Sequence, residues 1–186
     1  MTRTTSFESN CKIESDPTAV TFANKAIASR YPGCRIEMVT DKARQLKGID
    51  YIAHTPNGPI NIDVKIRKGV ESYWKWDGQD VLLEYKQGSA KYGWGTDPSL
   101  ETDLILFLFP WGKPEQYKSS GWTKSLWLPH RFVRDYISRY KSSCGERAGY
   151  NGYAYSYCIS PTITQLENAW VEMDYKLEGR LASIRD

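Results

Sequence analysis

Residues 60–67 alternate between β-branched and polar side chains, which predicts a β-strand with one buried face. A second apolar run, residues 49–53, precedes this strand, and the intervening Thr-Pro-Asn-Gly-Pro at 55–59 is rich in turn-forming residues. The two runs together predict a β-hairpin. Side chains two residues apart on a strand project from the same face, so Asp63 and Lys65 lie side by side on the polar face of the second arm. Asp50 opens the first arm.

The turn of this hairpin decides whether its three charged side chains meet. A four-residue loop at 55–58 places Asp50 directly opposite Asp63, and a two-residue loop at 57–58 places Asp50 opposite Lys65. A three-residue loop without a bulge would pair Asp50 with Val64 and scatter the charges over both faces. Two of the three registers therefore cluster them.

The remaining pattern predicts a mixed α/β domain. Helices are expected at 17–31, 129–141 and about 162–184, where apolar residues recur at steps of three and four. Strands are expected at 35–39, 80–85, 104–109 and 125–128, with a further edge strand at 153–159, and loops at 86–100, 111–123 and 142–152. With no repeat or break in composition, residues 1–186 are expected to form one domain. A C-terminal strand and helix are expected at 151–184.

Composition adds few constraints. A net charge of +3 permits a nucleic-acid partner without requiring one. The four cysteines form no CxxC pair and no zinc-ligand spacing, and no segment has the length or hydrophobicity of a signal core or a membrane span. We therefore expect a cytoplasmic protein with free thiols that does not interact with membranes; the alternative is a secreted protein with two disulfides.

Two carboxylates beside a lysine are suited to metal-assisted phosphodiester chemistry. Carboxylate oxygens are preferred ligands of Mg²⁺, which takes few protein ligands and keeps several waters. Such an ion activates a bound water and offsets charge on a phosphoryl oxygen, and a neighbouring lysine orients the water or stabilises the developing charge. The alternative interpretation is a solvated sheet face with cross-strand ion pairs of little energetic value.

This stretch resembles the PD-(D/E)XK, or restriction-endonuclease-like, nuclease superfamily, and in particular its small phage- and plasmid-type members. Asp50 matches the first acid, although Ile49 stands where the family name has proline, and Asp63-Val64-Lys65 matches the (D/E)XK element. The surrounding sequence also agrees: Gln45-x-x-Gly48 ahead of the first acid, then Gly93-Trp94 and Thr102-Asp103 before an apolar strand. The resemblance implies an αβββαβ core over about 17–142, with a mixed sheet flanked by helices.

The resemblance also implies roles for individual residues. Asp50 and Asp63 would bind Mg²⁺ or Mn²⁺, with the backbone carbonyl of Val64 as a further ligand, and Lys65 would act in catalysis. Accessory residues near the site would be drawn from Gln45, Glu84 and Glu14, with Asp16 as another acid of the first helix.

Residues expected to contact nucleic acid lie outside this trio. Basic side chains follow the second arm and line one face of the 129–141 helix, and an aromatic residue lies in the 86–100 loop: Arg67, Lys68, Arg131, Arg134 and Trp94. The histidines, His54 and His130, are expected to be structural. The apolar stripe of the last helix serves either the core or a homodimer seam.

The predicted function is a Mg²⁺- or Mn²⁺-dependent deoxyribonuclease that hydrolyses phosphodiester bonds in DNA. Two alternatives stay open. One is a catalytically silent nucleic-acid-binding or assembly module on the same fold, and the other is a dimeric, structure-specific endonuclease that resolves DNA junctions.

Overall fold

The computed structural model describes residues 17–66, 80–90, 92–110, 122–150, 155–173 and 175. The chain forms two compact units, each assembled from separate stretches. The described part of the first, here called the hairpin unit, comprises 17–66, 99–110 and 122–130. The described part of the second, the small-sheet unit, comprises 80–98 without residue 91, and 131–175 without 151–154 and 174.

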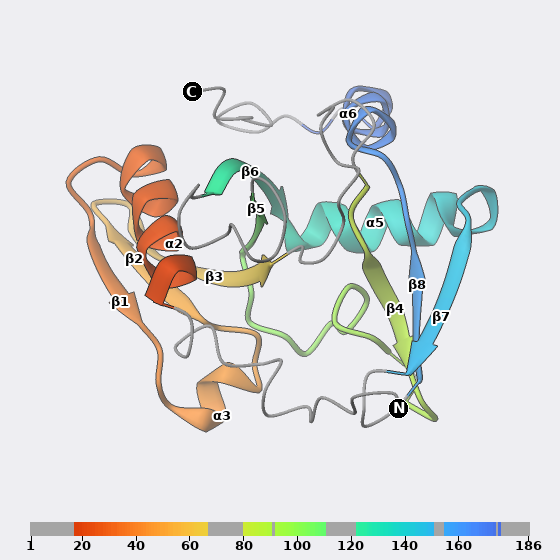
Figure 1. Ribbon diagram of the computed structural model, residues 1–186, viewed down its shortest axis with the longest axis horizontal. Helices are drawn as coiled ribbons and strands as arrows, with labels where there is room; N and C mark the ends of the chain where they lie inside the picture. The colour runs from red at the N-terminus through yellow and green to blue at the C-terminus, as the bar shows by residue number, and fades with distance from the viewer. Residues whose placement is uncertain are drawn as a thin grey trace. The chain divides into compact units, whose positions relative to one another are not determined.

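The hairpin unit is built on a five-stranded mixed sheet. Its strands lie in the order β1 (Arg35–Met38), β2 (Tyr51–Thr55), β3 (Gly58–Ile66), β5 (Leu104–Pro110) and β6 (Trp122–Pro129). All neighbours are antiparallel except β3 and β5, which run parallel. The predicted mixed α/β class is thereby confirmed (Figure 1).

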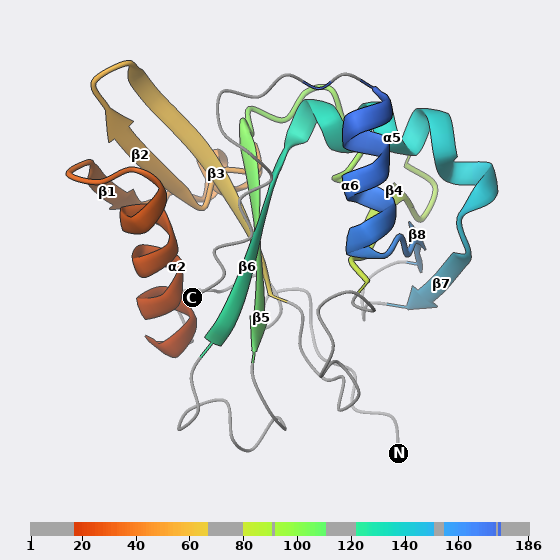
Figure 2. The same cartoon turned by 90° about the horizontal axis from the view of Figure 1, so that it is seen from above.

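Helix α2 (Pro17–Arg30) covers one face of this sheet and contacts β1, β5 and β6 (Figure 2). Its buried face is made mostly of alanines, which let helix and sheet approach closely, and it ends just before Pro32-Gly33 as predicted. The ring of Tyr31 meets the ring of Trp127 edge to face at 6.4 Å, and the Arg30 guanidinium lies 5.2 Å from the Trp127 ring centroid. Trp127 pairs with Leu106 across β5 and β6, so α2 lies on the face shared by these two residues.

The small-sheet unit holds a three-stranded antiparallel sheet in the order β4 (Leu83–Gln87), β8 (Tyr155–Ile159) and β7 (Glu146–Tyr150). Helices α5 (His130–Tyr140) and α6 (Ile163–Glu172) belong to it from residue 131 onward, with a short 3-10 helix η4 (Lys141–Ser143) after α5. The ring centroids of Phe132 and Trp170 lie 4.7 Å apart and join the two helices. Thr162 and Gln165 form a capping box that begins α6.

Three expectations for this unit were wrong. Strand β4 begins at Leu83 rather than at residue 80, and it belongs to a sheet separate from that of β1, β2, β3, β5 and β6. Strand β8 is the centre of that sheet rather than an edge, because β7 forms within the segment 142–152 that was expected to be a loop. The sequence of β7, Glu-Arg-Ala-Gly-Tyr, has no apolar alternation, since the strand is an exposed edge and derives its pairing from the backbone of β8.

The apolar stripe of the last helix serves the core where the structure describes it. Leu166 and Trp170 are buried, whereas Val171 is 79% exposed. Helix α6 ends at Glu172, and the expected continuation to 184 lies outside the described residues apart from Met173 and Tyr175.

Two further expectations concern cysteines and membranes. Cys34, Cys144 and Cys158 are free thiols, as predicted, and Cys11 lies outside the described residues. Among the residues described, none of the helices has the length and hydrophobicity required to cross a membrane.

Gly93 has a structural role that its place in a loop does not suggest. Its N–H donates to the Tyr85 carbonyl at 2.9 Å, which fastens the loop to β4. A Cβ at position 93 would lie 2.7 Å from the backbone nitrogen of Lys86 and 2.8 Å from the carbonyl oxygen of Glu84. Backbone atoms of a paired strand cannot yield to it, so glycine is required there.

We expect Gly93→Ala to lower the free energy of unfolding by roughly 1–3 kcal/mol, the usual cost of overpacking. The matched control is Gly149→Ala on β7, where an added Cβ would meet nothing within 4 Å. Urea denaturation of the two variants tests this difference. Equal midpoints for both would contradict the close approach of this loop to β4.

Candidate active site

The register of the hairpin is the one that places Asp50 opposite Asp63. Strands β2 and β3 pair Tyr51 with Ile62 and continue in register to Thr55 and Gly58. One more step in the same register sets Asp50 across from Asp63. The predicted register is confirmed from Tyr51–Ile62 to Thr55–Gly58, although the turn is tighter than a four-residue loop because Thr55 and Gly58 are themselves paired. Gly58 accommodates this turn with a φ of 117°.

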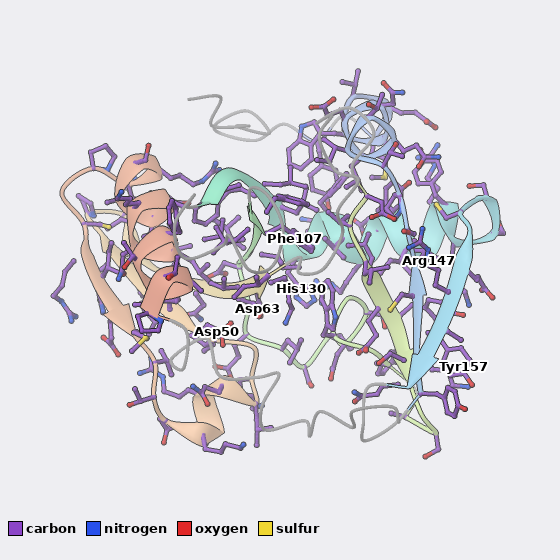
Figure 3. All side chains as sticks on the ribbon, in the orientation of Figure 1. Asp50, Asp63, Phe107, His130, Arg147 and Tyr157 are labelled. Atoms are coloured by element: carbon purple, nitrogen blue, oxygen red, sulfur yellow. The ribbon has the colours of Figure 1, made fainter. Side chains whose placement is uncertain are left out.

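Asp50 lies just before the first residue of β2, and its side chain accepts a hydrogen bond from the backbone of β3. Its backbone N–H donates to the Ile62 carbonyl at 2.9 Å, and its carboxylate Oδ2 accepts the N–H of Val64 at 2.8 Å. Strand β3 extends beyond the start of β2, so this N–H has no regular ladder partner on that side and the Asp50 side chain supplies one. Figure 3 shows Asp50 and Asp63 close together at this end of the hairpin.

The segment before Asp50 is held by a second loop of the same unit. Gly48 adopts a left-handed φ of 75°, and its carbonyl accepts a 2.7 Å hydrogen bond from the Thr102 hydroxyl. A Cβ at position 48 would overlap that hydroxyl oxygen, so both the space and the backbone angle require glycine. The glycine two residues before the first acid therefore helps to fix where Asp50 enters the sheet.

Asp63 and Lys65 form a close ion pair on the same face. The Lys65 Nζ lies 2.8 Å from each carboxylate oxygen of Asp63. The Asp63 side chain is 6% exposed and the Lys65 side chain 32% exposed, so the acid is buried while the amine reaches the surface. Such a geometry is more enclosed than a solvated surface ion pair, for which little energy is expected.

The environment of Asp50 favours its protonated form. Burial raises the pKa of the Asp50 carboxyl to about 7, and the neighbouring Asp63 carboxylate adds to the increase. Lys65 and the N–H of Val64 act in the opposite direction but do not offset it. Without a bound cation, the protein therefore holds a carboxyl group with a pKa of about 7 beside a second carboxylate.

Part of this burial comes from residues that sequence analysis did not assign to the site. The parallel pairing of β3 and β5 places Ile105 beside Asp63 and Phe107 beside Lys65, on one face of the sheet. Both apolar residues are almost fully buried. The apolar run 104–109 was identified as a strand, but its parallel pairing with β3 depends on long-range contacts that have no local signal.

The donor set fits a small divalent cation. Two carboxylates supply hard oxygen ligands, and the N–H and C=O of one strand residue point the same way, so the Val64 carbonyl is directed toward the side of β3 where Asp50 lies. Within the described residues, no group of three or more His, Cys, Asp and Glu side chains gathers. The metal ligands on this face would therefore be Asp50, Asp63 and the Val64 carbonyl, completed by water.

The other expected site residues have mixed outcomes. The side-chain amide of Gln45 donates to the Val39 carbonyl at 2.9 Å, and the Val39 N–H donates to the Asp50 carbonyl, so Gln45 supports the backbone of the site. Glu84 lies in the small-sheet unit, where its carboxylate accepts the N–H of Trp94 at 3.3 Å. Its expected approach to the carboxylate pair stays a prediction. Glu14, Asp16, Arg67 and Lys68 lie outside the described residues.

The remaining candidates for nucleic-acid contacts all belong to the small-sheet unit. Trp94 is half-buried in the loop held by Gly93 and Gly95. Arg131 is exposed and lies 3.9 Å from Asp135 one turn along α5, and Arg134 is half-buried. Their roles in binding stay predictions.

His54 has more partners than a structural role next to a turn suggested. Its Nε2 lies 2.8 Å from a carboxylate oxygen of Glu37 and 2.7 Å from a guanidinium nitrogen of Arg35. The opposite charges of Arg35 and Glu37, two residues apart in the sequence, were the available signal for this group. They did not identify His54 as a partner.

Comparison of the chain with protein-family models, curated proteins and solved structures found no match. Membership of the PD-(D/E)XK superfamily thus stays a prediction from the motif. The geometry of the carboxylate pair is independent evidence about the site.

We expect Asp50→Asn to stabilise the metal-free protein at pH 8 by roughly 4 kcal/mol. The folded pKa of about 7 lies above the unfolded value near 3.8, so stability falls as the pH rises between these values and the full penalty applies above pH 7. An amide carries no such penalty and still accepts the Val64 N–H. The gain should disappear below about pH 4, as measured by urea denaturation in EDTA across this range.

The control for this substitution is Asp41→Asn, which removes an exposed carboxylate from the same unit. Asp41 caps α3 (Lys42–Gln45), and asparagine serves equally well at that position. We expect its effect to stay within about 0.5 kcal/mol at every pH. A gain for Asp50→Asn that did not change with pH would show that Asp50 titrates normally.

Proposed function

We propose that this protein is a metal-dependent nuclease that hydrolyses phosphodiester bonds in DNA. The observation that carries the proposal is the meeting of the Asp50 and Asp63 carboxylates on one sheet face, with Lys65 within 2.8 Å of Asp63. The same residues match the PD-(D/E)XK motif, and α2 followed by the antiparallel strands β1, β2 and β3 supports the corresponding fold.

Burial distinguishes this site from a surface ion pair. Asp63 is 4% exposed, and placing a second carboxylate next to it raises the free energy of the metal-free protein. A module that only binds nucleic acid has no use for two acids that repel phosphate. A divalent cation would neutralise both carboxylates, which favours the enzyme over the silent module.

A cation at this site would be held by Asp50, Asp63 and the Val64 carbonyl. When bound, Mg²⁺ or Mn²⁺ supplies an activated water and offsets negative charge on the phosphoryl oxygens. In the hydrolysis that we propose, a P–O bond to the water oxygen forms, the P–O bond to the leaving sugar oxygen breaks, and that oxygen takes a proton. The metal ligands would thus position both the water and the phosphate.

Lys65 contributes positive charge beside the reacting phosphate. Asp63 orients its ammonium through contacts of 2.8 Å with both carboxylate oxygens, and the stem of Lys65 lies next to Phe107 in the parallel pairing. An ammonium fixed in this way stabilises the charge that develops on a phosphoryl oxygen in the transition state. Because it is part of the same ion pair, Lys65 also limits the repulsion between the two acids.

We expect the purified protein to cut DNA in Mg²⁺ or Mn²⁺ and not in EDTA. Asp63→Asn and Lys65→Met should each lower the cutting rate by at least about 100-fold, since each removes a group that acts on the phosphate. Single-stranded, duplex and branched substrates resolved on denaturing gels provide the measurement.

The matched controls are Glu167→Gln and Lys25→Gln, which remove an exposed charge of each sign from α6 and α2. Both should cut like the unsubstituted protein. A cutting rate that is unchanged in Asp63→Asn and Lys65→Met would contradict the proposal. Cutting confined to branched DNA by a stable dimer would identify the junction-resolving alternative.

Metal binding should depend on pH in a way that follows from Asp50. The cation must displace the proton that Asp50 holds below pH 7, so the apparent affinity for Mn²⁺ should rise about tenfold per pH unit up to that value and level off above it. Calorimetric titration at several pH values measures this slope. An affinity that stays constant from pH 5.5 to 8 would show that metal binding displaces no proton from Asp50.

A further inference from the structure

The sheet face that carries the carboxylate pair also carries a second group of charged side chains. Strand β1 pairs Arg35 with His54 and Glu37 with Ile52, and β2 in turn pairs Ile52 with Asn61. Paired residues and residues two apart on a strand share a face, so all of these lie on the face of Asp50 and Asp63. Helix α2 covers the opposite face.

Arg35, Glu37, Arg44 and His54 form this second group, here called the β1–β2 cluster. Glu37 lies at its centre. One carboxylate oxygen lies 3.1 Å from the Arg44 guanidinium, and the other lies 2.8 Å from His54 and 3.5 Å from Arg35. The hydrogen bond with His54, followed by the bond and charge of Arg44, keeps the pKa of Glu37 below its usual value despite some desolvation. Two permanent cations thus share one carboxylate, and the cluster is positive overall.

The two guanidinium groups are both oriented and accessible. The side chain of Arg35 is 67% exposed and that of Arg44 45% exposed. Each guanidinium has five N–H donors, more than the Glu37 carboxylate can accept, and its flat fork matches the oxygens of a phosphate. Because Glu37 already holds both side chains, an incoming anion would order fewer rotamers.

The cluster lies at a distance that suits one continuous nucleic-acid strand. Glu37 is opposite Ile52, two residues from Asp50 on β2, and Arg35 is opposite His54, four residues from Asp50. At about 3.3 Å per residue, these positions are roughly 7–13 Å along the strand from Asp50. Phosphates of one strand advance about 3.4 Å per nucleotide along a duplex axis and lie farther apart along the backbone itself, so this span covers at most a few nucleotides.

We propose that the β1–β2 cluster binds a backbone phosphate within a few nucleotides of the scissile one, with Arg35 and Arg44 as the donors. The cluster would then fix which phosphodiester bond reaches Asp50 and Asp63. This inference rests on the proposed nuclease function, because the position of the cluster is defined relative to the carboxylate pair.

The competing explanation is that the charges only protect an edge. β1 is the edge strand of its sheet, and charged side chains there discourage pairing with another chain. Edge protection requires charge alone and no particular anion. The two explanations differ in what the loss of one guanidinium does to DNA binding.

The test is DNA binding by the full chain in EDTA, measured by fluorescence anisotropy of labelled single-stranded and duplex DNA across a salt series. Arg35→Gln and Arg44→Gln should each weaken binding about 5- to 10-fold and reduce the slope of log K against log salt by about one. Arg35→Lys keeps the charge and should retain the slope, with an intermediate affinity because a lysine cannot form the fork. Lys25→Gln, the same loss of charge on α2, is the control and should change neither quantity.

Cutting assays separate this inference from the function on which it rests. If the protein cuts DNA, the two glutamine variants should raise KM with kcat unchanged. If cutting persists and Arg35→Gln and Arg44→Gln behave like Lys25→Gln in both assays, the cluster protects an edge and the inference fails while the nuclease stands. If no DNA is cut in any metal but both variants still weaken binding, the nuclease proposal fails and the cluster is an anion site of a binding module.

Discussion

The pairing of β2 with β3 is the constraint on which the candidate site depends. Side chains alternate between the faces of a strand, so a slip of one residue in this register would send Asp50 to the face covered by α2. In the register observed, Tyr51, Ala53 and Ile62 are buried and Asp50 and Asp63 share the other face. The same apolar residues that stabilise the hairpin therefore also determine that the two acids meet.

This arrangement places two carboxylates that repel each other next to one another in a sheet. The pKa of Asp50 is raised because burial and a second carboxylate both disfavour its charge. This repulsion is reduced because Lys65 forms an ion pair with Asp63 and the N–H of Val64 donates a hydrogen bond to Asp50. Groups with such pKa values gather at functional sites, where a cation or a substrate relieves the repulsion.

The residues proposed for hydrolysis and those proposed for phosphate binding would occupy adjacent parts of one sheet face. The carboxylate pair lies where β3 extends past β2, and the β1–β2 cluster lies farther along the same face. Strand β5 provides Ile105 and Phe107 at one side of the acids, which limits water around them. A negative site next to a positive one suits a polyanion that must be held by some phosphates and attacked at another.

The sequence by itself determined the hairpin, its three charged residues and the mixed α/β class, because alternation and turn residues are local signals. It also limited the register to a few alternatives, of which the structure selected one. Only the tertiary structure decided that β5 runs parallel to β3 and places apolar residues beside the site. It also decided that β4, β7 and β8 form a separate sheet. It likewise showed that Glu37 gathers Arg35, Arg44 and His54. These features depend on residues far apart in the chain, whose pairing is set by packing and leaves no periodic trace in either segment.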